Sequence, residues 1–280
     1  MSAISIETKR IDELEKLANI AADGQFLYYA ADGKATNKVT MNDILNYIRT
    51  VSPNSLFSGK YLGDKVTPEQ YEDISTGTFK LVQLGDYWTM GGHNWRNWGA
   101  DWYKNRGDTA LNAHHIVVMP DEMLLTAYGS TTHYMNDSNT TGGGYKETKM
   151  RKTYIPQMTT TITGLFGADH VLKHRELITN AVANGAASNW EWVDSQVEIP
   201  SEVMMYGSRV WGGHYDTASQ YSQLPLAKLK PEFINVRAQS YWLRDVASAS
   251  WFAGVSNDGL ANYYDASHAW VGVRPYFLLG

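Results

Sequence analysis

Short apolar and aromatic segments, separated by glycines and other turn-forming residues, constrain the fold of this chain most strongly. QFLYYA at 25–30, HHIVVMPD at 114–121 and YWLRDVA at 241–247 are examples. The chain also has ten Trp, eighteen Tyr and twenty-four Gly among its 280 residues. Such a composition favours sheets and turns over helical bundles, because aromatic side chains suit pleated surfaces. The sequence therefore predicts that strands and irregular segments dominate.

Charge, cysteine content and hydropathy exclude several classes of protein. The formal net charge is −5 and no basic run occurs, so nucleic acid is not expected as a partner. Cysteine is absent, which excludes disulfide scaffolds, cysteine zinc sites and cysteine nucleophiles. No signal-peptide core is present, and no segment approaches the roughly 18 apolar residues of a membrane span. We therefore expect a protein that folds in a cytoplasm without membrane insertion.

Residues 1–54 are predicted to form a small unit of their own. QFLYYA and NKVT (37–40) flank the turn signal Asp32-Gly33, which indicates a β-hairpin. Thr40 is a suitable N-cap for a following short helix, with Asp43 three residues later. So few large apolar side chains make a marginal core. We expect this unit to need a partner surface or copies of itself.

Residues 55–280 are predicted to form one α+β domain, rich in strands with a few helices. Pro and Gly between 51 and 70 mark the boundary. Strands are expected at both ends of the domain and helices between them, which favours α+β. The predicted strands are 85–103, with a turn at Gly91-Gly92, then 114–121, 191–199, 204–211, 241–247, 251–255 and 271–279, and the predicted helices are 68–75, 154–167 and 174–185, the last ending at Gly185.

Histidine pairs give the first candidates for chemistry. His170 and His174 are four residues apart, a spacing that would place both imidazoles on one helix face where zinc could bind. Val171 occupies the position of the metalloprotease glutamate, so the catalytic base is missing and a structural role is favoured. His114 and His115 are adjacent on a predicted strand and point to opposite faces, so they cannot share a metal.

Carboxylates near aromatic residues give a second set of candidates. A glycosidase would need two of them to face one another, whereas turn contexts explain most of these positions. Sequence motifs of serine hydrolases, phosphate-binding loops and dinucleotide-binding folds are absent, so no enzyme activity and no cofactor are expected. The carboxylates considered are Asp86, Asp101, Asp108, Glu191 and Asp194.

A cluster of four tryptophans, Trp88, Trp95, Trp98 and Trp102, has two interpretations. In the first interpretation the cluster is a sugar-stacking platform, because flat indole faces suit sugar rings. Tryptophan is also bulky and mostly buried in folded proteins. We favour a core role for most of them.

The C-terminal segment 241–279 resembles the end of the C-type-lectin-like domains of phage and prophage tail proteins. In that family a WLR strand, a polar variable loop and a closing GVRP strand follow in this order. Here they correspond to Trp242–Arg244, to the loop, and to Gly272–Pro275. Weaker similarity extends back through GKYLGDKVTPEQY, GDYWTMGG, RGDTALNAHHIVVMPD, TTGGGY and LKHRELITNAVANG, so that it covers roughly residues 59–280.

The N-terminal unit is similar to the opening module of phage fibre and appendage proteins. The matching segment is RIDELEKLANIAADGQFLYYAADGKATNKVTMNDI. The resemblance implies that residues 1–54 attach the chain to other virion proteins, with a homotrimer as the expected assembly. It further implies a location in the virion, after assembly in the bacterial cytoplasm and release by lysis.

Calcium-dependent sugar binding is not expected, because the Glu-Pro-Asn or Gln-Pro-Asp and Trp-Asn-Asp triplets of calcium lectins are missing. Some phage members of the class diversify their C-terminal loop with a retroelement that mutates adenines. SNDGLANYYDASHA has the Asn, Tyr, Asp, Ser, His and Ala content that this process favours. Diversification is therefore a hypothesis for this loop.

Together these features predict a virion structural protein that binds a glycan or protein on the host-cell surface, at a tail fibre or tail tip. Alternatives are a head fibre or capsid decoration protein of the same fold, and a polysaccharide-cleaving enzyme. Strands at 242–246 and 272–278 would frame a display loop, unless that loop is only a solvated turn. Arg244 and Arg274 are expected to act inside the fold, with Asp245 or backbone carbonyls as partners. The predicted ligand-binding residues are Trp251, Asn257, Asp258, Asn262, Tyr263, Tyr264, Asp265, Ser267, His268 and Trp270.

Overall fold

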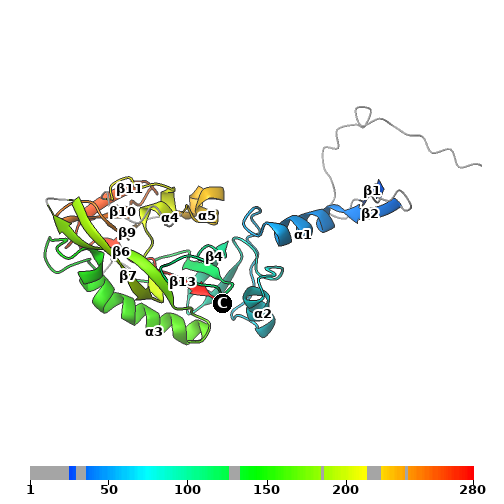
Figure 1. Ribbon diagram of the computed structural model, residues 1–280, viewed down its shortest axis with the longest axis horizontal. Coiled ribbons are helices and arrows are strands. Elements are labelled where there is room, and N and C mark those ends of the chain that lie inside the picture. Colours follow the sequence, from blue (N-terminus) through cyan, green and yellow to red (C-terminus); the bar gives the residue numbers. More distant parts are fainter. Residues whose placement is uncertain (1–24, 30–35, 126–132, 184–185, 213–221, 237–238) are drawn as a thin grey trace, which may run out of the picture. The chain divides into compact units, whose positions relative to one another are not determined.

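The computed structural model of the protein describes residues 25–29, 36–125, 133–183, 186–212, 222–236 and 239–280. The chain divides into two compact units, Met1–Ile48 and Arg49–Gly280. The division lies a few residues before the predicted boundary at 55. Helices and strands both occur, and the described strands form several separate sheets, so this is a strand-rich α+β fold (Figure 1).

The N-terminal unit contains the predicted hairpin and the start of the predicted helix. Strands β1 (Gln25–Tyr29) and β2 (Thr36–Thr40) pair antiparallel, and helix α1 (Met41–Val51) follows at once. The Thr40 backbone N–H donates to Asp43 Oδ2 at 2.8 Å, and the Asp43 N–H donates to Thr40 Oγ1 at 3.1 Å, so the predicted cap is confirmed. No residue of α1 is buried. The turn residues Asp32-Gly33 lie outside the described residues.

A five-stranded antiparallel sheet lies at the centre of the second unit. The predicted turn is confirmed, because Gly91 and Gly92 have φ of 58° and 82°, which glycine adopts without steric cost. Strand β13, from the C-terminal part of the chain, lies inside the sheet between β5 and β8. The sheet has the order β3 (Tyr87–Met90), β4 (His93–Ala100), β5 (Ile116–Pro120), β13 (Tyr276–Leu279) and β8 (Val197–Glu198).

A second sheet of four strands comes from the C-terminal segment. Its order is β11 (Ala261–Asp265), β10 (Trp251–Val255), β9 (Ser240–Val246) and β12 (Val271–Gly272). Strands β9, β10 and β11 are antiparallel neighbours, and β12 runs parallel to β9. The predicted display loop 256–270 is therefore not one loop, since β11 lies within it and forms a hairpin with β10.

Of the three helices predicted for the second unit, two are confirmed and one is wrong. Helix α2 (Pro68–Ser75) begins at a complete capping box made by Thr67 and Gln70, and α3 (Ile155–Phe166) buries one apolar face. The segment 174–185, in contrast, forms strand β6 (His174–Ala183), which pairs with β7 (Ala186–Ser195) in a long hairpin. Because 174–183 is a strand, there is no helix there for Gly185 to cap. Gly185 itself lies outside the described residues.

The predicted strand 204–211 is also wrong. Residues Glu202–Tyr206 form a short helix, α4, capped by the Ser201 side chain and closed by Gly207 in a left-handed conformation. The remaining regular elements are α5 (Pro225–Leu229), a 3-10 turn at Pro231–Phe233, a 3-10 turn at Tyr145–Glu147 and a π-helical turn at Met150–Tyr154 before α3.

The four tryptophans of the cluster are all buried, so they are core residues. Trp88 and Trp95 belong to one apolar cluster, and Trp98 and Trp102 belong to a second cluster. The core role is confirmed, and a sugar platform made of these four rings is excluded because they expose at most 4% of their surface.

Candidate ligand-binding surface

The β10–β11 hairpin places successive side chains on alternate faces of the four-stranded sheet. Trp251 pairs with Asp265 and Ala253 with Tyr263, whereas Phe252 pairs with Tyr264. Because side chains alternate along a strand, Trp251, Tyr263 and Asp265 share one face, and Tyr264 lies on the other. The predicted ligand-binding residues are therefore divided between two faces of one hairpin.

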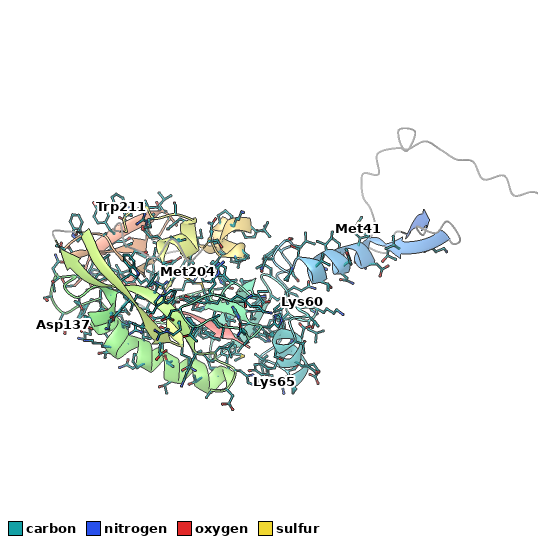
Figure 2. The ribbon with its side chains drawn as sticks, in the orientation of Figure 1. Met41, Lys60, Lys65, Asp137, Met204 and Trp211 are labelled. Carbon is teal, nitrogen blue, oxygen red and sulfur yellow. The ribbon has the colours of Figure 1, made fainter. Side chains whose placement is uncertain are left out.

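Three aromatic rings in contact form what we call the aromatic ridge: the exposed Trp211 and Trp251 and the partly buried Tyr263. The Trp251 and Tyr263 rings are stacked with centroids 4.6 Å apart, and the Trp211 ring meets Tyr263 edge-on at 4.5 Å. Trp251 and Trp211 remain 38% and 42% exposed. Figure 2 shows Trp211 at the same end of the unit as β10 and β11. The ridge is a ready aromatic surface at the edge of a packed sheet.

Polar groups fix the outer end of the ridge. The Trp251 indole N–H donates to Asp265 Oδ1 at 2.5 Å, and the Asn139 side-chain amide donates to the same oxygen at 2.9 Å. Asn139 also accepts a hydrogen bond from the Ala266 backbone N–H at 3.0 Å. The indole of Trp251 is thus oriented by a carboxylate that is itself held from a different segment of the chain.

Side chains on the opposite face of the hairpin hold the strands together and offer less surface to a ligand. The Tyr264 ring meets Trp242 edge-on at 5.8 Å, and its hydroxyl donates to Ser240 Oγ at 2.9 Å. Asn262 donates to the Tyr264 hydroxyl at 3.3 Å, and His268 lies edge-on to the Tyr264 ring. Tyr264 therefore holds β11 against β9, which together with β13 we call the frame. The predicted ligand role suits Tyr263 better.

The hairpin turn carries Asn257 and Asp258, which are both exposed. Asp258 accepts hydrogen bonds from the Ser256 hydroxyl and from the Leu260 N–H. These hydrogen bonds, led by that from Ser256, lower the pKa of Asp258. Of the remaining predicted residues, Trp270 is 66% exposed and Ser267 is partly exposed.

Trp211 is not among the ligand-binding residues predicted from the sequence. It precedes β9 by about thirty residues in the chain, and no spacing links it to the C-terminal hairpin. Its neighbourhood was predicted to be a strand, whereas it follows the short helix α4. Only the tertiary contact with Tyr263 brings it to the surface formed by Trp251 and Asp265.

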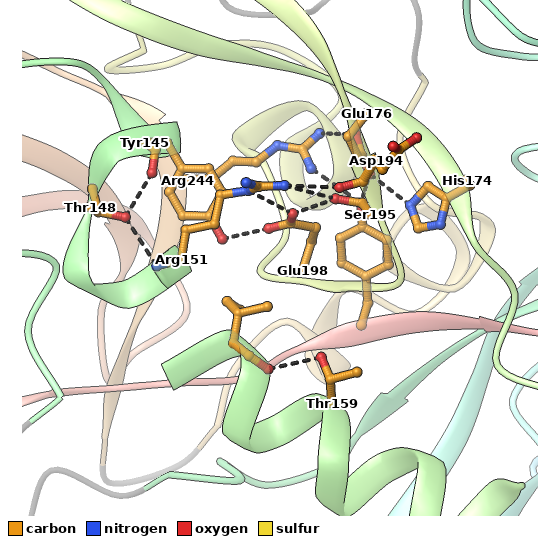
Figure 3. A network of polar contacts seen from close by, with 12 residues as sticks. Tyr145, Thr148, Arg151, Thr159, His174, Glu176, Asp194, Ser195, Glu198 and Arg244 are labelled. Atoms are coloured by element: carbon orange, nitrogen blue, oxygen red, sulfur yellow. Dashed lines mark hydrogen bonds and ion pairs between the residues drawn. The ribbon is translucent and has the colours of Figure 1, made fainter. Parts of the chain in front are cut away.

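A buried polar network supports the frame (Figure 3). Arg244 Nη2 lies 3.0 Å from Glu176 Oε2, and its Nη1 donates to the Tyr276 hydroxyl at 3.1 Å. The Tyr276 hydroxyl donates to Glu176, and His174 Nε2 lies 3.2 Å from the same carboxylate. Burial works against the charged form of Glu176, but Arg244 and the hydrogen bond with His174 outweigh it and hold its pKa at about 2.

A second buried carboxylate adjoins this network. Glu198 accepts hydrogen bonds from the Tyr145 hydroxyl at 2.6 Å, from Arg151 Nε at 3.0 Å and from the Ser195 hydroxyl. Burial, followed by the charge of Glu198, raises the pKa of Tyr145. Both carboxylates are thus engaged by several donors, and the pattern is that of a structural network.

Arg244 and Arg274 act inside the fold, as predicted. The structure pairs Arg244 with Glu176, a residue that the sequence did not suggest. Arg274 is fully buried and donates to the carbonyl oxygens of Pro120 at 2.8 Å and Phe233 at 2.9 Å. Its guanidinium also lies 4.8 Å from the Trp98 ring centroid.

The histidine pairs do not form metal sites. His170 lies in a turn, where its ring stacks on Tyr71 and its Nδ1 is 2.9 Å from the Gly280 carbonyl. His174 is buried in strand β6, so the shared helix face that zinc would require does not exist. His115 is buried between the Tyr103 N–H and the Ala113 carbonyl, and burial lowers its pKa to about 4.

Each of the five candidate carboxylates is engaged by donors of the fold itself. Asp86 accepts the Lys60 and Gln83 N–H groups, and burial raises its pKa. Asp101 contacts His114 at 2.7 Å. Each of the other three meets a basic side chain: Asp108 and Asp194 share Arg175, and Glu191 meets Lys146.

In the described part of the chain, no group of three or more metal-ligating side chains is positioned to hold an ion. No described helix is both long and apolar enough to cross a membrane. Comparison with known proteins gave no matching family, no matching curated protein and no matching solved structure.

Proposed function

We propose that the protein is a phage virion structural protein that binds a ligand on the host-cell surface through the aromatic ridge. The resemblance of its C-terminal segment to lectin-like phage tail proteins suggests this function. The single observation that carries the proposal is the ridge itself: Trp251 and Tyr263 of the edge hairpin contact Trp211 from the segment after α4, and both tryptophans are exposed. Large exposed aromatic groups beside polar side chains are typical of binding surfaces.

The chemistry of the ridge indicates which ligands would fit. Trp251 and Trp211 offer broad apolar ring surface, and Asp265 adds one negative charge beside it. A carboxylate disfavours anionic ligand groups such as phosphate, and accepts hydrogen bonds from hydroxyl or amide groups. An uncharged glycan or a protein loop therefore suits this surface.

Binding of the purified chain to a panel of bacterial strains tests the proposal. Trp251→Ala and Tyr263→Ala should each weaken binding by about tenfold or more, because central aromatic residues dominate binding energy. The matched control is Trp190→Ala, which removes a 44% exposed indole from β7. Equal binding by the ridge variants and the control would contradict the proposal, as would failure of the protein to compete with phage adsorption.

Two treatments of the host cells separate the ligand classes. Periodate oxidation destroys sugar rings, and protease digestion removes surface proteins. We expect periodate to abolish binding if a glycan is the ligand, and protease to abolish it if a protein is the ligand. Host wall polysaccharide incubated with the chain should show no release of reducing ends, and release that depends on Asp101 or Asp194 would favour the enzyme alternative.

Residues 1–54 would attach the chain to the virion, with a homotrimer as the proposed assembly. Helix α1 has no buried residue, which fits a module that completes its core with partners. Sedimentation of the full chain should give three times 31.4 kDa. Antibody labelling of virions in electron micrographs distinguishes a tail position from the head-fibre or capsid alternative.

The proposed diversification of the C-terminal loop has a structural limit. Tyr263 and Asp258 could vary with little effect on the frame, whereas Tyr264 packs on Trp242 and hydrogen-bonds to Ser240. A reverse transcriptase and a template repeat beside the coding region are expected. Their absence would contradict diversification without affecting the proposal of ligand binding.

A further inference from the structure

Glu202 is a fully buried carboxylate directed at a loop. It is the first residue of α4, and both of its side-chain oxygens accept backbone hydrogen bonds. Its donors are the N–H groups of Val210 at 3.0 Å, Trp211 at 3.0 Å and Gly212 at 2.7 Å. Three successive N–H groups around one carboxylate form a small anion-binding concavity made by the loop itself.

The same residue is tied to the frame. The Glu202 backbone N–H donates to Asp245 Oδ2 at 2.6 Å, and Asp245 belongs to strand β9. The connection therefore runs from β9 through Glu202 to the backbone of Trp211, and from the Trp211 ring to Tyr263. Each step is a direct contact between neighbouring groups.

The placement of Trp211 needs such a connection. Its indole is 42% exposed, so burial alone does not fix it, and the described residues around it, 207–212, form neither a strand nor a helix. A loop held only at its ends samples many conformations, which weakens binding through the cost of ordering it. Hydrogen bonds that consecutive backbone N–H groups donate to one carboxylate restrict the loop directly.

We propose that Glu202 is a positioning residue that holds Val210–Gly212 so that Trp211 completes the aromatic ridge as a second ligand-contact segment. The inference rests on the proposed function for its effect on binding. The positioning itself is a property of the free protein and has its own readout.

The test uses Glu202→Gln in the full-length chain labelled with 5-fluorotryptophan. The amide keeps a similar shape but turns an N–H₂ group toward backbone donors, so it cannot accept all three hydrogen bonds. The ¹⁹F signal of Trp211, assigned by its loss in Trp211→Phe, should move toward the position of a solvent-exposed indole. The signal of buried Trp242 in the frame is the internal control and should not move.

Binding to host cells gives the second readout. Glu202→Gln should weaken binding by about tenfold, as expected for loss of one ordered contact. Adding it to Trp211→Ala should cause no further loss, since residues that act through one another are not additive. Equal, additive losses would indicate a general effect on the fold and would overturn the inference.

The outcomes separate the two proposals. A displaced Trp211 signal in a protein whose wild type binds no host strain supports the positioning role and contradicts the proposed function. An unchanged Trp211 signal with full binding in Glu202→Gln overturns the positioning role alone. If this variant does not fold, hydrogen exchange of the wild type decides: protection of the amides of Val210, Trp211 and Gly212 supports the inference, and rapid exchange overturns it.

Discussion

Removing Arg244 should destabilise the second unit more than any single surface change, because it leaves Glu176 buried without its cation. In Arg244→Met the guanidinium that lies 3.0 Å from Glu176 Oε2 is lost, while the carboxylate stays fully buried. Breaking a buried ion pair on one side typically costs about 3–5 kcal/mol. For a unit of this size each kcal/mol lowers the melting temperature by about 2–4 °C, so a fall of roughly 6–20 °C is expected.

Thermal and urea denaturation of Arg244→Met, Glu176→Gln and the double variant would measure this effect. The double variant should be more stable than Arg244→Met by about 1 kcal/mol or more, because a neutral amide needs no cation and still accepts a hydrogen bond from Tyr276 or His174. The reasoning is refuted if Arg244→Met costs less than about 1 kcal/mol, or if the two single effects simply add in the double variant.

Three further predictions concern pH, packing and capping. Because the pKa of buried His115 is lowered to about 4 from 6.5, the unfolded state binds the proton more readily. Neutral His115 therefore contributes up to about 3 kcal/mol to the free energy of unfolding above pH 6.5, and this contribution is lost as the pH falls toward 4. Between pH 7 and 4.5 the urea midpoint of His115→Gln should fall less than that of the wild type. Gly254→Ala would place a Cβ 2.8 Å from the Tyr264 ring and should cost about 1–3 kcal/mol; Gly164→Ala, where nothing lies within 4 Å, is the control and should not destabilise. Thr67→Ala removes the side-chain half of the α2 capping box and should lower the unfolding free energy by about 1 kcal/mol, whereas an unchanged value would show that Pro68 and packing suffice to start the helix.

The sequence predicted those elements whose signals are local and unopposed. The turn at Gly91-Gly92, the helix after Thr67 and the buried strand 116–120 each depend on neighbouring residues and were confirmed. The frame strand at 240–246 was also confirmed. In these cases one pattern had one structural interpretation.

The errors arose where one pattern allowed two interpretations. The apolar residues of 174–183 fit a helix as well as a strand, and the Asn184-Gly185 pair, a strong hairpin signal, was interpreted as a helix end. Asp258-Gly259 is a signal of the same kind, and β11 follows it within the segment predicted to be a display loop. At 202–207 the N-cap Ser201 and the closing Gly207 indicated the helix that was missed.

The candidate site depended on contacts that a single sequence does not contain. Trp211 reaches Tyr263 across 52 residues of chain, and Arg244 meets Glu176 across 68. Neither separation follows a helical or strand period, so no pattern could have joined them. The loop composition pointed to Trp251 and Tyr263, but only the hairpin register shows that Tyr264 faces the other way.

Strand β13 has a consequence for the order in which the protein can fold. Tyr276–Leu279 pairs with β5 on one side and β8 on the other, and all four residues are buried. During synthesis the two partner strands emerge well before it, each with an open edge that invites pairing with another chain. The sheet closes only when residue 279 is available, so a nascent chain that pauses earlier is exposed to aggregation. A truncation just before Tyr276 would therefore give an insoluble product rather than a slightly smaller domain.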